Sequence, residues 1–124
     1  MEVVTSTAET NNRAYVFPGQ GSQSVGMGSE LLELSQAARE TFEEADDSLG
    51  APLSRLILEG PASDLQNTAN SQPAIMTMSI AAWRAWQEMQ GPQAVTAKAV
   101  AGHSLGEYTA LVAAGVAPLS SALK

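Results

Sequence analysis

The stretch Lys98-Ala99-Val100-Ala101-Gly102-His103-Ser104-Leu105-Gly106 decides the fold of this chain. Residues 98–101 are short and apolar enough for a buried strand, and Leu105 starts a series of apolar residues at helical spacing. Between them, residues 102–106 fit the pattern G-x-S-x-G, a sharp strand-to-helix turn that exposes a nucleophilic serine. The sequence therefore predicts a strand, an elbow and a helix, with Ser104 as the candidate nucleophile.

An elbow alone does not make a catalyst, because a serine hydroxyl is a weak nucleophile at neutral pH. It needs a base to take its proton and hydrogen-bond donors for the oxyanion. The amides at a helix N-terminus point toward such a nucleophile, so the N–H of Leu105 is the natural first donor. A bare G-x-S-x-G also arises by chance, and an ordinary strand-to-helix turn is the alternative interpretation.

A second segment has the same organisation near the start of the chain. The β-prone run Ala14-Tyr15-Val16-Phe17 breaks at Pro18-Gly19-Gln20-Gly21-Ser22-Gln23. A strand would therefore lead into a tight loop that is rich in backbone and amide donors. Such a loop suits close approach to a ligand, and an ordinary turn would have the same composition.

Three motifs together carry a resemblance to a known family. They are Phe17-Pro18-Gly19-Gln20-Gly21-Ser22-Gln23 with Gly26-Met27-Gly28, then Asn70-Ser71-Gln72-Pro73-Ala74, then Gly102-His103-Ser104-Leu105-Gly106-Glu107-Tyr108. In this order and spacing the chain resembles the malonyl-CoA:acyl carrier protein transacylases from Tyr15 onward. It is closer to the stand-alone bacterial enzymes than to the acyltransferase domains of polyketide synthases, which share the motifs.

The resemblance implies an α/β fold that is incomplete. Residues 14–124 would form the N-terminal part of the α/β-hydrolase-like large subdomain, with two parallel strands and flanking helices. The family's ferredoxin-like subdomain and the C-terminal part would be absent, and residues 1–13 would be a flexible leader. A single α/β unit with this elbow commonly needs ~200 to 250 residues, which agrees with a partial domain.

The resemblance also implies a ping-pong acyl transfer within fatty acid biosynthesis. Ser104 would accept the malonyl group from malonyl-CoA and pass it to the phosphopantetheine thiol of acyl carrier protein. The backbone N–H of Gln20 would join that of Leu105 in the oxyanion hole. The family uses malonyl-CoA as a substrate and needs no resident cofactor or metal.

Two further residues match family positions near the substrate. Gln72 corresponds to a glutamine beside the pocket, although a polar residue at a helix start before Pro73 is an equally good interpretation. His103 corresponds to the histidine next to the nucleophile. Because an elbow neighbour projects away from the serine hydroxyl, His103 is expected to orient or pack against the acyl pocket rather than to act as the base.

The chain departs from the family pattern in its missing base. His103 is the one histidine of the sequence, whereas the family's base is a second histidine far downstream of the nucleophile. The family's carboxylate-binding arginine also belongs beyond Lys124. The isolated chain is therefore predicted to be inactive. A polyketide synthase domain, a serine hydrolase, or a non-catalytic acyl-thioester-binding protein if Lys124 is a true terminus, remain alternatives.

Composition narrows the choice of partners. The 124 residues contain 6 Lys and Arg against 13 Asp and Glu, a net charge of −7, which argues against nucleic-acid binding. No apolar run approaches the ~20 residues of a membrane span, so a cytoplasmic protein is expected. The sequence has no cysteine and therefore no disulfide. Phosphates of coenzyme A and an acidic carrier protein would need a basic docking surface outside this sequence.

Helices are expected to fill the rest of the chain. Apolar spacing places them at residues 30–34, 37–49, 53–58, 63–65 and 73–90. The last is the longest, with Pro73 in its first turn and Gly91 at its end. An acidic cluster on residues 40–47 is expected to be a solvated helix face, because nothing places its carboxylates around one point.

Overall fold

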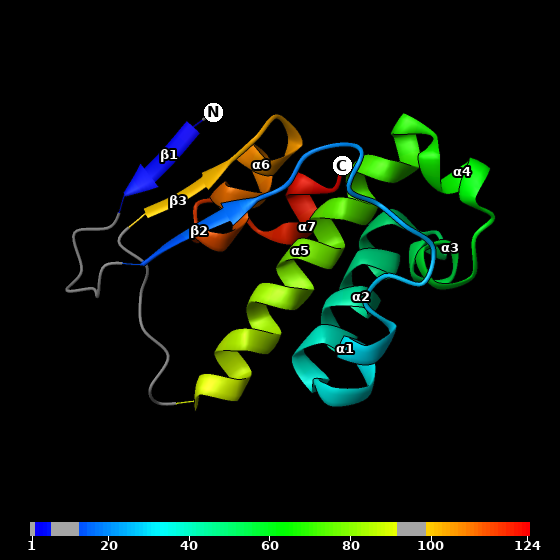
Figure 1. Ribbon diagram of the computed structural model, residues 1–124, viewed down its shortest axis with the longest axis horizontal. Coiled ribbons are helices and arrows are strands. Elements are labelled where there is room, and N and C mark those ends of the chain that lie inside the picture. Colours follow the sequence, from blue (N-terminus) through cyan, green and yellow to red (C-terminus); the bar gives the residue numbers. More distant parts are fainter. Residues whose placement is uncertain (1, 6–12, 92–98) are drawn as a thin grey trace.

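The computed structural model describes residues 2–5, 13–91 and 99–124. Its sheet contains three short strands, β1 (Glu2–Thr5), β2 (Ala14–Phe17) and β3 (Ala99–Gly102), in the order β1-β3-β2 (Figure 1). Strands β2 and β3 are parallel, and Phe17 at the end of one lies opposite Gly102 at the end of the other. The two predicted motifs therefore leave the sheet at the same edge.

Strand β1 corrects the prediction for the start of the chain. A flexible leader was expected over residues 1–13, but Glu2–Thr5 pair with β3 in the antiparallel sense, and residues 1 and 6–12 lie outside the described part of the chain. The sheet thus has one more strand than the predicted parallel pair. The segment of residues 1–13 is mostly polar, which led to the expectation of a leader. It also contains the β-branched residues Val3 and Val4, which favour a strand where another strand has an unpaired edge. The placement of a domain boundary at residue 13 stays a prediction.

The described part of the chain contains seven helices, which are α1 (Ser29–Leu34), α2 (Gln36–Leu49), α3 (Leu53–Glu59), α4 (Ala62–Gln66), α5 (Thr68–Gln90), α6 (Leu105–Ala113) and α7 (Leu119–Ala122). Helices α1 to α4 lie on the far side of α5 from the sheet (Figure 1). Helix α6 packs on the strands, and α5 contacts both α6 and α2. Helix α5 thus joins the sheet to the helical part. The predicted α/β class, with parallel strands and flanking helices, is confirmed.

Helix α5 begins five residues earlier than predicted. Its N-cap is Asn67, whose side-chain oxygen accepts a hydrogen bond from the N–H of Ala69 at 3.1 Å. Pro73 therefore lies inside the helix rather than at its first position. Proline is common in the first turn of a helix, but it does not have to lie there. Here the N-cap residue Asn67 determines where α5 begins. Gln72 is consequently a residue of the second turn, so its alternative role at the helix start is wrong.

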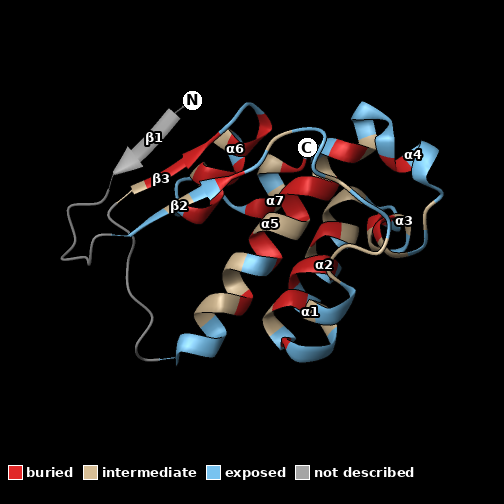
Figure 2. Ribbon diagram, viewed as in Figure 1, coloured by how far each residue is buried: buried red, intermediate tan, exposed pale blue. Residues whose placement is uncertain are grey.

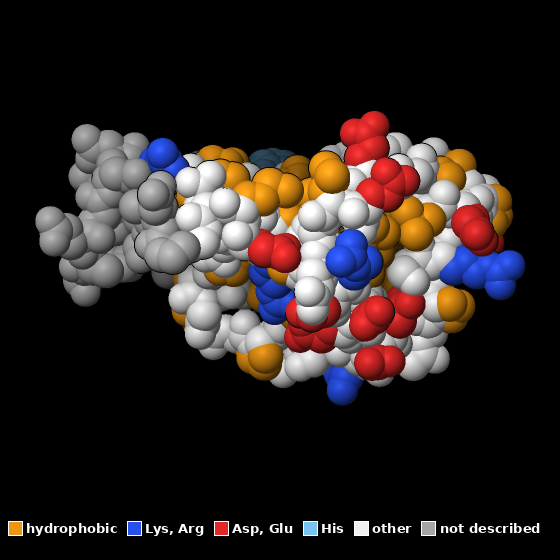
Figure 3. Space-filling view, turned by 90° about the horizontal axis from the view of Figure 1, so that it is seen from below, with side chains coloured by type: hydrophobic (Ala, Val, Ile, Leu, Met, Phe, Trp, Pro, Cys, Tyr) orange, Lys and Arg blue, Asp and Glu red, His pale blue; other side chains and the backbone are white. Residues whose placement is uncertain are grey.

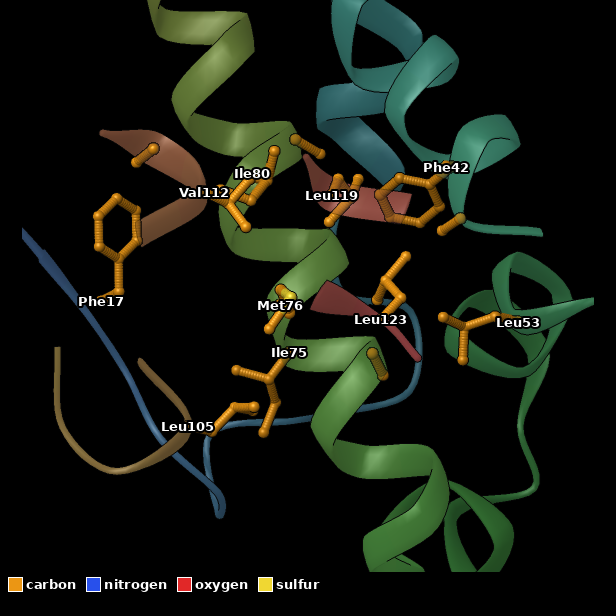
Figure 4. Packing of buried hydrophobic residues seen from close by; sticks show 14 of the residues in the cluster. Phe17, Phe42, Leu53, Ile75, Met76, Ile80, Leu105, Val112, Leu119 and Leu123 are labelled. Carbon is orange, nitrogen blue, oxygen red and sulfur yellow. The ribbon is translucent and has the colours of Figure 1, made fainter. Parts of the chain in front are cut away.

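One buried apolar cluster connects the strands and the helices (Figure 2). Its larger members are Phe17, Phe42, Leu53, Ile57, Leu65, Ile75, Met76, Ile80, Leu105, Val112, Leu119 and Leu123. Figure 4 shows Leu105 of α6 and Ile75 of α5 pointing toward one another within this cluster. The residue after Ser104 is therefore part of the core, which anchors the start of α6.

A polar joint fixes α5 against the start of α2. The carboxylate of Glu88 accepts hydrogen bonds from the hydroxyl of Ser35 at 2.5 Å and from the N–H of Ala37 at 3.0 Å. These hydrogen bonds, that from Ser35 first, lower the pKa of Glu88 below its usual value. In the same pair of helices, Arg84 of α5 contacts Glu44 of α2 at 2.7 Å. These contacts hold the C-terminal part of α5 against α2, at the opposite end of the helix from its first turn.

Acidic side chains spread over the helical part of the face seen in Figure 3, with a few basic ones between them. Three residues of the predicted acidic cluster have local partners, and the first, Glu40, accepts a hydrogen bond from the side-chain amide of Gln36. Glu44 pairs with Arg84, and Asp46 accepts hydrogen bonds from the N–H and the hydroxyl of Ser54. None of the helices in the described ranges is long and apolar enough to cross a membrane.

Candidate active site

Ser104 sits in a strained backbone conformation at the turn between β3 and α6. Its φ of 55° and ψ of −113° make it the one non-glycine residue with a positive φ in the described part of the chain. Such a conformation costs roughly 1–3 kcal/mol and persists only where the surrounding structure enforces it. Ser104 is also exposed and directly precedes the first residue of α6. The turn therefore has the properties of a nucleophile elbow.

The two glycines of the motif allow the elbow to close. A Cβ atom on Gly102 would lie 1.9 Å from both the carbonyl carbon and the oxygen of Gly106. A Cβ atom on Gly106 would lie 2.2 Å from the carbonyl oxygen of Phe17. Side chains at these positions would overlap backbone atoms, which have little freedom to move away. The close packing of β2, β3 and α6 thus explains both glycines.

The loop after β2 lies against this elbow. The N–H of His103 donates a hydrogen bond to the carbonyl oxygen of Phe17 at 3.2 Å. At Gly19 a Cβ atom would lie 2.6 Å from the carbonyl oxygen of His103 and 3.3 Å from its Nδ1 atom. Two motifs more than eighty residues apart are therefore neighbours, as the parallel pairing of β2 with β3 requires. The imidazole of His103 lies on the side of the loop.

Hydrogen bonds within the loop hold its shape. The N–H of Gly21 donates to the side-chain oxygen of Gln23 at 2.9 Å, and the hydroxyl of Ser22 donates to the carbonyl oxygen of Gly19 at 2.9 Å. The side-chain amide of Gln20 leaves the loop and donates to the hydroxyl of Thr68 at 3.1 Å. Sequence reasoning did not single out Thr68, which only the folded arrangement brings to the loop.

A cavity of about 1130 Å³ opens beside Ser104. Ser104, Leu105 and Gln72 contribute to its wall, whereas Gln20 and His103 do not. Its remaining wall comes from α5, the α2–α3 connection, α3, α6 and the last residues of the chain, including Ala51, Leu53, Leu56, Asn70, Met76, Tyr108 and Leu123. Asn70 and Tyr108 belong to the motifs quoted above, whereas the apolar residues of this wall had no such signal, because each is an ordinary core residue until the helices meet.

The polar chemistry of this cavity is incomplete among the described residues. Glu107 and Lys124 are the charged residues of its wall, which holds neither a histidine nor an arginine. The described wall therefore lacks the histidine that the family resemblance implies as the base, and Glu107 is its one carboxylate side chain. The described residues also contain no group of three or more His, Cys, Asp or Glu side chains that could hold a metal ion.

Comparison with known proteins agrees with this geometry. The model of the acyl transferase domain family matches residues 14–124. Malonyl CoA-acyl carrier protein transacylases from Bacillus subtilis strain 168 and Salmonella typhimurium are 50% and 49% identical over 110 and 111 residues. These alignments cover 89% and 90% of this chain but 33% and 35% of the relatives. The chain thus spans about a third of their length.

Solved structures give the same result. The malonyl CoA-acyl carrier protein transacylase of Coxiella burnetii has a TM-score of 0.85 and 41% identity, covering 95% of this chain and 36% of its own. An acyl-carrier-protein S-malonyltransferase of Burkholderia pseudomallei has a TM-score of 0.82 and 50% identity, covering 91% and 36%. The resemblance inferred from the three motifs is confirmed. With a family match over residues 14–124, the chain belongs to the acyl transferase domain family.

Proposed function

We propose that this chain supplies the nucleophile and the oxyanion hole of a malonyl-CoA:acyl carrier protein transacylase. The observation that carries the proposal is the strained, exposed Ser104 at the mouth of a large cavity. Strain at a non-glycine residue is maintained where function needs it. Transacylases of this name are about half identical to the chain over 110 residues, which supports the same acyl group and acceptor.

In this reaction the Oγ atom of Ser104 attacks the thioester carbonyl carbon of malonyl-CoA. A bond forms between Oγ and this carbon, the carbon–sulfur bond breaks, and coenzyme A leaves as the thiol after taking up the serine proton. The phosphopantetheine thiol of acyl carrier protein then attacks the malonyl ester and releases Ser104. The cavity wall holds no histidine, so the proposal requires the base histidine from elsewhere in the natural polypeptide or from a partner chain.

The oxyanion of each tetrahedral intermediate would be stabilised by the backbone N–H groups of Gln20 and Leu105. Leu105 is the first residue of α6, where the N–H has no partner within the helix. Among the described residues, neither N–H donates a backbone hydrogen bond outside the regular helices and strands. The hydrogen bond from His103 to Phe17 supports the proposal further, because it brings the loop of Gln20 to the elbow.

Gln72 and His103 are proposed to contact the substrate in different ways. Gln72 is in the cavity wall together with Ser104, which supports a hydrogen bond from its amide to the bound acyl group. His103 is outside that wall and close to Gly19. A role in supporting the loop side of the acyl site fits this position, and a role as the general base does not.

The partners and the setting follow from this reaction. Malonyl-CoA and acyl carrier protein are the proposed substrates, no resident cofactor is involved, and fatty acid biosynthesis in the cytoplasm is the proposed setting. A solved malonyl-transacylase in complex with a type II polyketide synthase acyl-carrier protein is 45% identical to this chain. The net charge of −7 makes a basic surface on another part of the enzyme necessary for docking.

The test uses the natural polypeptide that carries this chain, incubated with malonyl-CoA and then with phosphopantetheinylated acyl carrier protein. Intact mass should show one malonyl group on the enzyme and its later transfer to the carrier. Ser104→Ala should form no malonyl-enzyme. A malonyl-enzyme that still forms in Ser104→Ala would contradict the proposal, and free malonate in place of malonyl-carrier would indicate a hydrolase.

A further inference from the structure

We propose that Thr68 is a positioning residue for the oxyanion hole. Its hydroxyl accepts the side-chain amide hydrogen bond of Gln20 at 3.1 Å, across 48 residues of sequence. This inference rests on the proposed function, in which the backbone N–H of Gln20 stabilises the oxyanion. Holding the side chain of Gln20 fixes the orientation of the peptide group to which that N–H belongs.

The loop needs an anchor at this position. The hydrogen bonds of Gly21 with Gln23 and of Ser22 with Gly19 set the shape of the loop but do not attach it to another element. Its attachment to the elbow, through Phe17 and Gly19, lies on the N-terminal side of Gln20. The hydrogen bond to Thr68 is the side-chain contact that joins Gln20 to another element of the described structure.

Thr68 is a suitable anchor because its own position is well determined. It is the first residue of α5, directly after the cap at Asn67. The side-chain amide of Asn70, in the same turn, donates to the carbonyl oxygen of Asp64 at 2.9 Å and ties the helix start to α4. Helix α5 then continues for 23 residues against α2 and α6. Movement of Thr68 would therefore require movement of the scaffold.

The same helix end also serves the cavity. Gln72 follows Thr68 by four residues, so the two lie on one face of α5. One turn of helix thus holds the oxyanion loop through Thr68 and lines the substrate cavity with Gln72. This arrangement couples the position of the donor on Gln20 to the wall that receives the acyl group.

The experiment compares Thr68→Val with Thr68→Ser in the natural polypeptide. Valine keeps the β-branched shape and removes the hydroxyl, whereas serine keeps the hydroxyl. Removal of an oxyanion donor costs ~10²- to 10³-fold in rate, so misplacing one donor should slow malonyl-enzyme formation at saturating malonyl-CoA about 10-fold. Because the donor acts on the transition state, KM should change less than the rate. Thr68→Ser should restore the rate.

Two controls separate positioning from general damage. Ser63→Ala removes another exposed hydroxyl from the first turn of a helix and should leave the rate unchanged. Gln20→Met removes the side-chain amide, and adding Thr68→Val to it should cause no further loss, because both substitutions break the same hydrogen bond. Further loss of comparable size in the double variant would overturn the inference.

A second measurement does not depend on acyl transfer. Amide hydrogen exchange of peptides covering residues 18–23 should be faster in Thr68→Val than in Thr68→Ser, with unchanged urea midpoints. Equal exchange and equal rates in Thr68→Val and the unsubstituted protein would overturn the role of Thr68. If the unsubstituted protein forms no malonyl-enzyme, the proposed function fails. The anchoring role of Thr68 is then decided by exchange alone: faster exchange of residues 18–23 in Thr68→Val supports it, and equal exchange contradicts it.

Discussion

The elbow and the loop that face each other in this site are held in different ways. At the elbow, backbone contacts enforce the conformation, because Gly102 lies against Gly106, Gly106 lies against Phe17, and Ser104 is strained between the two glycines. In the loop, hydrogen bonds of side chains set the shape, and the attachment of Gln20 comes from Thr68, 48 residues away. The elbow therefore depends on close backbone packing of β2, β3 and α6, whereas the loop depends on a side-chain hydrogen bond to a distant helix.

The largest effect is expected from Gly102→Ala, because this substitution acts directly on the close contact between β3 and α6. The added Cβ would lie 1.9 Å from backbone atoms of Gly106, so the strand and the helix must separate. We expect a loss of more than ~3 kcal/mol in the free energy of unfolding, as for severe overpacking. The midpoint of urea unfolding of the natural polypeptide measures it.

Gly50→Ala is the matched control for this substitution. Unlike Gly102, Gly50 has a positive φ, 62°, but a Cβ there would meet nothing within 4 Å. Gly50→Ala should lower the free energy of unfolding by only about 1 kcal/mol, the cost of a left-handed conformation for alanine. Equal losses at Gly102 and Gly50 would show that steric contact does not hold the elbow.

The second prediction concerns the strain at Ser104. Ser104→Gly and Ser104→Ala should both abolish malonyl-enzyme formation, because each removes the nucleophile. Glycine adopts a φ of 55° without strain, whereas alanine at this position is as strained as serine. Ser104→Gly should therefore be more stable than Ser104→Ala by about 1 kcal/mol, after part of the relieved strain is offset by glycine's greater freedom in the unfolded chain. Equal urea midpoints would mean that the turn stores no strain.

The difference between the two regions also explains what sequence reasoning could predict. The strand Ala14–Phe17 was predicted at its observed bounds. The turn at Ser104 and the helix from Leu105 were also predicted, although the strand before them is Ala99–Gly102 rather than residues 98–101. Both are encoded by residue types within a few positions of each other. Their meeting at one edge was implied by the family resemblance, and its physical reason is the parallel pairing of β2 with β3.

The features that sequence reasoning missed depend on competing local signals or on tertiary packing. Strand β1 forms because β3 offers an unpaired edge, which a polar composition does not reveal. The start of α5 was misplaced because Pro73 is a more conspicuous signal than the cap at Asn67. Thr68 and the apolar cavity wall have no local signature. Their roles arise only when α5 is packed against its neighbours.

A smaller effect is expected inside the loop. Ser22→Ala removes the hydrogen bond to the carbonyl oxygen of Gly19, an exposed contact worth roughly 0.5–1 kcal/mol. The urea midpoint should change little, while amide exchange of residues 18–23 should accelerate. Ser22→Thr keeps the hydroxyl and should behave as the unsubstituted protein. If Ser22→Ala shifted the urea midpoint as far as Gly102→Ala, the contrast between loop and elbow would not hold.

The smallest effect is expected at the joint between α5 and α2, a long-range contact outside the site. Hydrogen bonds from Ser35 and then Ala37 hold the pKa of Glu88 below 4.5, so its carboxylate binds protons more weakly in the folded state. Its contribution to stability is therefore present above pH 4.5 and is lost as the pH falls through the lowered pKa. Solvent screening keeps this contribution small at an exposed carboxylate.

Glu88→Gln tests whether this joint supports the loop as well as the scaffold. The variant should lose stability at neutral pH and lose less than the unsubstituted protein on acidification below pH 4.5, whereas Glu43→Gln on the exposed face of α2 should keep the original pH dependence. Urea midpoints across this pH range measure the difference. Because Thr68 is at the opposite end of α5 from Glu88, exchange of residues 18–23 should be unchanged. Faster exchange in Glu88→Gln would show that the loop depends on the whole helix and not on its first turn alone.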